Sequence, residues 1–222
     1  MSKEESFLEW HMGDRYYYLF MSLALFILLP PFLIHFEFLG YAIYFLISVV
    51  IINCVLILFN GSNKTGYGII VLLASLAFIW LSVAQDWTNI YLQLVKLLTL
   101  ALFFGFTFAK MIGEIFRLKK VNGKVVIGAI GAYLLLGLIG AILFEIIELT
   151  YPNSFTQMDM FSSFYGKVYY SFVTISTLGY GDISPVSAQG QAAAILVSVS
   201  GQLYLAILMA MLVGKFLKDS DW

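Results

Sequence analysis

Six apolar runs dominate the sequence, each of a length that can cross a bilayer as a helix. Crossing about 30 Å of hydrocarbon takes roughly 20 helical residues. Charged residues make up 11% of the 222 residues, whereas soluble domains carry about 25%, so the chain lacks the charge to wet a surface of its size. We therefore predict an all-α membrane protein with six transmembrane helices. They cover approximately residues 16–36, 41–59, 67–84, 90–109, 125–149 and 185–217.

The basic residues predict how these helices are oriented. Cytoplasmic segments of membrane proteins are enriched in lysine and arginine. If both termini are cytoplasmic, Lys96 lies within the membrane, Lys167 lies outside, and the other ten of the twelve basic residues lie inside. The ten are Lys3, Arg15, Lys64, Lys110, Arg117, Lys119, Lys120, Lys124, Lys215 and Lys218. We expect a multi-pass protein of the cell membrane.

Several function classes are disfavoured by charge and residue content. The net charge is −1, and a nucleic-acid-binding surface needs a basic patch. Cys54 is the only cysteine, so it has no second thiol for a disulfide or a cysteine metal site. An intramembrane enzyme needs paired catalytic groups, but the acids lie at the ends of the spans. We do not expect an enzyme.

One segment between the last two runs does not fit a simple turn. Residues 150–184 contain a short amphipathic stretch, 161–176, which is too short to span the bilayer, and then a glycine-rich run. Irregular backbone at membrane depth is tolerated only where protein buries it or where it lines a water-filled pore. This segment is predicted to be re-entrant and to carry the function.

The glycine-rich run resembles the signature of potassium channels. It reads Thr-Ile-Ser-Thr-Leu-Gly-Tyr-Gly-Asp over residues 174–182. Residues 201–208, within the last apolar run, resemble the inner helix of the same pore module. The resemblance covers about residues 125–217, under half of the chain. With the pore loop between the last two of six spans, it implies a six-helix potassium channel of the voltage-gated-like type.

The resemblance implies which residues contact the ion. A potassium ion that enters a narrow pore loses water, and rings of backbone carbonyls from four chains replace it. By resemblance, the carbonyls of Thr177, Leu178, Gly179 and Tyr180 form the ion sites, and the Thr177 hydroxyl adds the innermost ring. Gly179 and Gly181 supply backbone angles that other residues resist. Potassium is the permeant ion, no cofactor is expected, and three identical subunits complete a homotetramer in the bilayer.

The same resemblance implies supporting roles. The ring of Tyr180 is expected to pack against Tyr169 and Tyr170 of the pore helix, and Asp182 to hydrogen-bond that helix. Gly201 is expected to be either a gating hinge or a packing position.

The sequence also departs from the family pattern. Val173 stands where many relatives have a carboxylate, so Glu145 and Glu148 either substitute for it or are solvated at the interface.

The first four predicted helices lack the charge pattern of a voltage sensor. The fourth run offers Lys96, and the next basic residue is Lys110 at its cytoplasmic end. We expect Lys96 to reach an interface, to pair with an acid such as Asp86, or to sense voltage weakly. The expected organisation is a cytoplasmic N-terminus (1–15), a sensor-like four-helix domain (16–120) and a pore domain (121–222), without a soluble ligand domain.

Two alternatives remain open. A less selective monovalent cation channel is disfavoured because Tyr180, which non-selective relatives usually alter, is intact. A secondary transporter is expected to show an internal repeat and ionisable residues at a midplane site, and the sequence shows neither.

Overall fold

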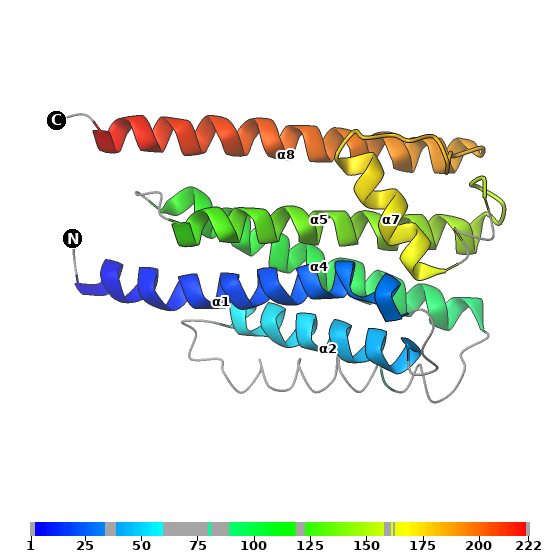
Figure 1. The fold of residues 1–222 in the computed structure, drawn as a ribbon, viewed down its shortest axis with the longest axis horizontal. Helices are drawn as coiled ribbons and strands as arrows, with labels where there is room; N and C mark the ends of the chain where they lie inside the picture. The colour runs from blue at the N-terminus through cyan, green and yellow to red at the C-terminus, as the bar shows by residue number, and fades with distance from the viewer. Residues whose placement is uncertain are drawn as a thin grey trace. The chain divides into compact units, whose positions relative to one another are not determined.

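The computed structural model describes residues 3–33, 39–59, 80, 89–118, 123–157, 161 and 163–220. Within these residues the protein is helical, and its one extended pairing is an isolated bridge between Phe155 and Pro185. The predicted all-helical class is confirmed for this part of the chain. The helices labelled in Figure 1 are α1 (Lys3–Leu28), α2 (Leu39–Leu58), α4 (Ile90–Arg117), α5 (Gly123–Thr150), α7 (Phe164–Ile175) and α8 (Ala188–Ser220).

Four helical segments of the described residues are long and apolar enough to cross a membrane. They are Gly40–Leu58, Ile90–Arg117, Gly123–Thr150 and Ala188–Lys215. These four correspond to the second, fourth, fifth and sixth predicted runs. Most of the third run, 67–84, lies outside the described residues, as does Asp86. The apolar helices indicate a membrane protein.

The first predicted run differs from the structure at both ends. α1 begins at Lys3, well before residue 16, and ends at Leu28. A short 3-10 helix, Pro30–Leu33, follows. Proline has no N–H and disfavours helical geometry at the residue before it, so the pair Pro30-Pro31 ends the helix. α1 is not among the four candidate spans, so a first transmembrane helix stays a prediction.

The chain forms two compact units. The first contains the described residues up to 87 together with 106–134, and the second contains 88–105 together with 135–222. The borders fall inside α4 and inside α5, so each of these helices contributes one end to each unit. The predicted domain division at residue 120 stays a prediction.

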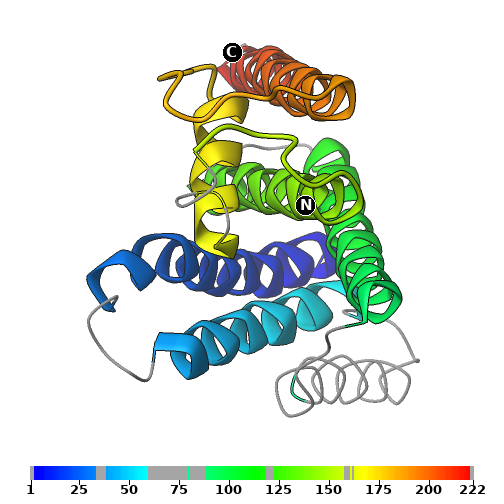
Figure 2. The same ribbon diagram turned by 90° about the vertical axis from the view of Figure 1, so that its right-hand side faces the viewer.

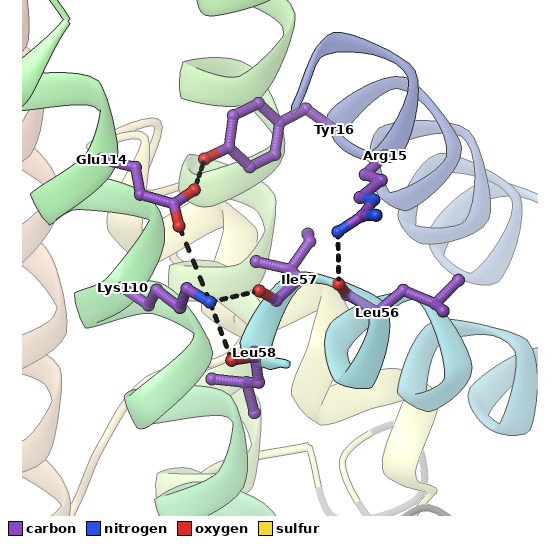
Figure 3. Close-up of polar contacts among 7 residues, drawn as sticks. All are labelled: Arg15, Tyr16, Leu56, Ile57, Leu58, Lys110 and Glu114. Carbon is purple, nitrogen blue, oxygen red and sulfur yellow. Dashed lines mark hydrogen bonds and ion pairs between the residues drawn. The ribbon is translucent and has the colours of Figure 1, made fainter. Parts of the chain in front are cut away.

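In the first unit, α1 and α2 lie side by side, and polar side chains join them to the C-terminal end of α4 (Figures 1 and 3). Lys110 Nζ donates to the carbonyls of Ile57 and Leu58, at 2.6 and 2.7 Å. Tyr16 donates from its hydroxyl to Glu114. The last carbonyls of a helix have no partner within the helix and favour a cation. Lys110 therefore caps α2.

This cap explains a difference from the sequence prediction. Residues from Lys110 onward were expected to form a polar segment after the fourth helix, but α4 continues to Arg117. Lys110 and Glu114 are four residues apart, so they lie on one face of the helix, and their charged groups are 3.7 Å apart. Because both side chains have partners on α1 or α2, the polar stretch packs as helix.

In the second unit, α7 runs across α8 and the C-terminal half of α5 (Figures 1 and 2). Its first turn is capped by Ser163, whose side chain accepts from the Gly166 N–H at 3.0 Å. Small residues permit the close packing on α5. An added Cβ would lie 2.5 Å from the Phe172 ring at Gly137 and 2.4 Å from Ser171 Oγ at Gly140.

Aromatic residues fill the space between α7 and the C-terminal end of α5. Tyr170, only 5% exposed, packs against Phe144, Phe155 and Phe161, with ring centroids 4.8, 5.4 and 5.9 Å away. Aromatic pairs prefer such tilted and edge-on arrangements at 4.5–7 Å. This cluster fixes the half-length helix in the unit although α7 is too short to span a membrane.

Candidate functional site

The candidate site is the segment 176–182, which follows α7 directly. Thr177 N–H donates to the carbonyl of Thr174 at 3.0 Å. The N–H groups of Leu178 and Gly179 both donate to the Val173 carbonyl, at 3.0 and 3.2 Å. These bonds satisfy carbonyls that the end of a helix leaves unpaired. The segment is therefore folded back over the C-terminal end of α7.

The backbone of this segment alternates in handedness. Thr177, Gly179 and Gly181 have φ values of 58°, 56° and 80°, whereas Leu178 and Tyr180 are not among the residues with positive φ. Residues of alternating handedness can turn successive carbonyls to the same side, whereas a regular strand points them alternately to opposite sides. Glycine accepts positive φ at little cost, and an added Cβ at Gly179 or Gly181 would meet no atom within 4 Å. The need for glycine in this chain is conformational.

Thr177 has a positive φ although it is not glycine. A non-glycine residue in the left-handed region costs about 1–3 kcal/mol, and such strain clusters at functional sites. The Thr177 hydroxyl accepts from Gln202 Nε2 of α8 at 3.3 Å. Thr177 was predicted to bind the ion through its carbonyl and its hydroxyl, whereas its neighbour Gln202 was not identified from the sequence.

The large side chains of the segment are exposed in the single chain. Leu178 is 54% exposed and Tyr180 is 67% exposed. Tyr170 lies in the aromatic cluster with Phe144, Phe155 and Phe161, and its packing against Tyr180 stays a prediction. Tyr169 is the pore-helix tyrosine that interacts electrostatically with Tyr180.

Asp182 is connected to α7 by a hydrogen bond. The Tyr169 hydroxyl donates to Asp182 Oδ2 at 2.5 Å, and the Ile183 N–H donates to Oδ1 at 3.0 Å. The hydrogen bond from Tyr169 lowers the pKa of Asp182, and accepting these donors favours the ionised form. The same bond raises the pKa of Tyr169 to about 12. A carboxylate and a neutral phenol therefore hold the end of the segment to the helix.

The C-terminal end of α7 contributes a field at the site. Aligned peptide dipoles give a helix C-terminus about half a negative charge. Ser176 Oγ donates to the carbonyl of Phe172 at 2.6 Å, and the described side chains around this turn are neutral. Val173 is buried, with its carbonyl accepting the two bonds from the segment. The arrangement favours cations over anions.

The two acids considered as replacements at Val173 have specific partners. Glu148 accepts from the backbone N–H groups of Asn153 and Ser154, at 2.7 and 3.1 Å. Glu145 Oε2 lies 2.8 Å from Lys167 Nζ. Both acids thus have partners at the C-terminal end of α5, and the two alternatives for them stay predictions. Lys167 was predicted to lie outside the membrane, and its role as a buried partner of Glu145 was not predicted.

Gly201 lies where α8 meets the end of α7. An added Cβ would be 2.4 Å from both Ile175 Cγ1 and the Ile175 carbonyl oxygen. This contact fits the packing alternative, because a backbone atom cannot yield as a flexible side chain can. A hinge role stays a prediction.

Residues 128–218 match a protein-family model described as "Ion channel". The matched region includes most of α5, all of α7, the segment 176–182 and most of α8, but it is less than half of the chain. No solved structure matches the chain. Together with the apolar helices, the match indicates an ion channel and argues against an enzyme.

Proposed function

We propose that the chain is one subunit of a homotetrameric, potassium-selective channel whose filter is the segment Thr177–Gly181. The observation that carries this proposal is that φ is positive at every second residue of the segment, namely Thr177, Gly179 and Gly181. Backbone of this kind can present successive carbonyls to one axis. In four copies, carbonyl oxygens then replace the water of the ion.

In this proposal, potassium binds at the carbonyls of Thr177, Leu178, Gly179 and Tyr180, with the Thr177 hydroxyl at the inner end. Tyr169 and Asp182 support the filter from outside, and their 2.5 Å hydrogen bond favours that role. Tyr170 supports it indirectly, as part of the aromatic cluster that holds α7.

The proposed channel has six transmembrane helices and cytoplasmic termini in a cell membrane. A sensor-like domain (16–120) precedes the pore domain (121–222). Two observations favour weak voltage dependence. Lys96 is the cation in the membrane part of α4. Four copies of this single charge contribute at most roughly 9 kcal/mol per 100 mV, whereas steep sensors carry about three to four charges in each subunit. Lys110, the next cation, is held by the two terminal carbonyls of α2 (Figure 3).

A less selective cation channel is the second candidate. The dipole of α7 alone attracts any cation, so it would suit either function. The intact Gly179-Tyr180-Gly181 sequence and its backbone geometry favour potassium selectivity.

The test is the reversal potential of the reconstituted channel with potassium on one side and sodium on the other. We expect a reversal near the potassium equilibrium value and a conductance that changes little with voltage. Gly179→Ala should abolish selectivity because alanine resists φ of 56°. Gly113→Ala, at a helical site with free space for a Cβ, is the matched control and should remain selective. A wild-type reversal near zero would establish the second candidate instead.

A further inference from the structure

Lys167 is a buried charge in the first turns of the pore helix. Its side chain is 3% exposed, although it is the fourth residue of α7. A lysine is rarely buried without a partner, and the positive end of the helix dipole disfavours a cation there. An apolar residue would avoid both costs. The position therefore needs an explanation other than packing.

The charge of Lys167 is compensated by groups from two other segments. Glu145 of α5 lies 2.8 Å from its ammonium, and the Phe161 ring centroid lies 5.1 Å from it. No hydrogen bond reaches Glu145 Oε2 within the described part of the chain, although the atom is buried. Lys167 is thus the direct counter-ion of this oxygen. Lys96 of α4 also interacts with Glu145 electrostatically.

The ion pair is one polar attachment between α7 and α5. Another is a buried bond from Ser171 Oγ to the Gly137 carbonyl, 2.6 Å long. Gly137 and Glu145 are about 12 Å apart along α5, and Lys167 and Ser171 about 6 Å apart along α7, at 1.5 Å per residue. The aromatic cluster around Tyr170 holds α7 by apolar packing, which tolerates small rotations better than directed polar contacts do. Two separated polar attachments add a directional constraint on the rotation of α7.

We infer that Glu145 and Lys167 are a positioning pair that sets the place of the proposed filter. The inference rests on the proposed function. Tyr169 follows Lys167 by two residues and holds Asp182 at the end of the filter segment. A rotation of α7 about the Ser171 attachment would move Tyr169 and pull on Asp182. A buried ion pair contributes little net stability compared with apolar residues but can specify one arrangement, and here the specified arrangement is that of α7 on α5.

The experiment compares single and exchanged variants in bilayers with potassium on one side and sodium on the other. Glu145→Gln and Lys167→Met should each lower the potassium-over-sodium permeability ratio by on the order of tenfold, because each leaves a buried group without its opposite charge. The exchange of both residues, Glu145→Lys with Lys167→Glu, should restore much of the ratio. A glutamate at the start of α7 also suits the helix dipole.

Two controls separate this role from others. Asp14→Asn removes an exposed ion pair with Lys124, 3.4 Å apart, and should leave the permeability ratio unchanged. Lys96→Met should also leave it unchanged. If Lys96→Met lowers the ratio as much as Glu145→Gln does, Glu145 serves α4 rather than α7, and the inference is wrong.

A merely structural pair gives a different result. Single variants would then yield fewer assembled channels, but those channels would reverse at the wild-type potential, which would overturn the inference. If a single variant does not assemble, the exchanged variant decides, since a selective exchanged channel supports the pair and a non-selective or unassembled one refutes it. A non-selective wild type would instead refute the proposed function itself.

Discussion

At the scale of single residues, Asp182 has an exposed side chain that accepts a short hydrogen bond from Tyr169. Its pKa is lowered from 3.8 by the hydrogen bond that Tyr169 donates, and Tyr169 keeps its proton because its own pKa is raised to about 12. A carboxyl with a lowered folded pKa contributes stability that is present above its unfolded pKa and lost as pH falls through the folded value. The bond between Tyr169 and Asp182 therefore persists throughout the neutral range.

We predict that external acid alters the potassium current only as pH falls below the ordinary range of aspartate. In Tyr169→Phe the bond is absent, so the pKa of Asp182 rises and the pH midpoint should move upward. Titrating the external solution in single-channel recordings measures both midpoints. Equal midpoints in the two proteins would show that the bond does not control Asp182.

The residues of the candidate filter could be selected from the sequence because residues 174–182 resemble the potassium-channel signature, whose glycines supply backbone angles that other residues resist. Positive φ at Gly179 and Gly181 matches that expectation. The positive φ of Thr177 could not be predicted, since threonine ordinarily avoids this region. The burial of Lys167 was also missed. It depends on how α7 lies against α5, and local sequence around a lysine carries no signal for a glutamate 22 residues earlier.

At the scale of elements, the contact between α7 and α8 depends on Gly201. Alanine there would place Cβ 2.4 Å from the carbonyl of Ile175, the last residue of α7. Overpacking of this kind costs about 1–3 kcal/mol, so Gly201→Ala should lower thermal stability. The added methyl group should also displace the end of α7 and thereby reduce the selectivity of the channel for potassium over sodium.

The control for this prediction is in the same helix. Gly214→Ala adds a Cβ where no atom lies within 4 Å, and alanine favours helix by up to about 1 kcal/mol over glycine. It should be neutral or stabilising in the same thermal unfolding measurement. If Gly201→Ala keeps wild-type stability but changes the open probability, Gly201 acts as a hinge and the packing role is wrong.

Element boundaries were predictable where a local signal marks them. The pore helix was expected over 161–176 and forms over Phe164–Ile175, with Ser163 as its cap. The prolines after Leu28 are a local signal of the same kind, and α1 ends at Leu28. The extension of α4 to Arg117 had no such signal. It depends on partners for Lys110 and Glu114 that come from α1 and α2, far away in the sequence.

At the scale of the whole molecule, the candidate filter is incomplete in one chain. Its side chains are largely exposed, and only 17% of the apolar window of α8 is buried. Exposed apolar surface of this extent is covered by lipid or by other subunits in a membrane protein. Carbonyl rings of the proposed kind need four loops around one axis, and one chain supplies one such loop. The proposed carbonyl rings therefore imply four subunits.

We predict that the purified channel has four times the 25.0 kDa mass of the chain. Native mass spectrometry from detergent measures this directly, and limited chemical crosslinking in lipid vesicles should give a ladder that ends at four. Glu145→Gln and Gly179→Ala should be tested in parallel, because a loss of selectivity within an intact tetramer separates filter geometry from assembly. Selective potassium currents from a monomer or dimer would contradict the carbonyl-ring mechanism, since two loops cannot surround the ion.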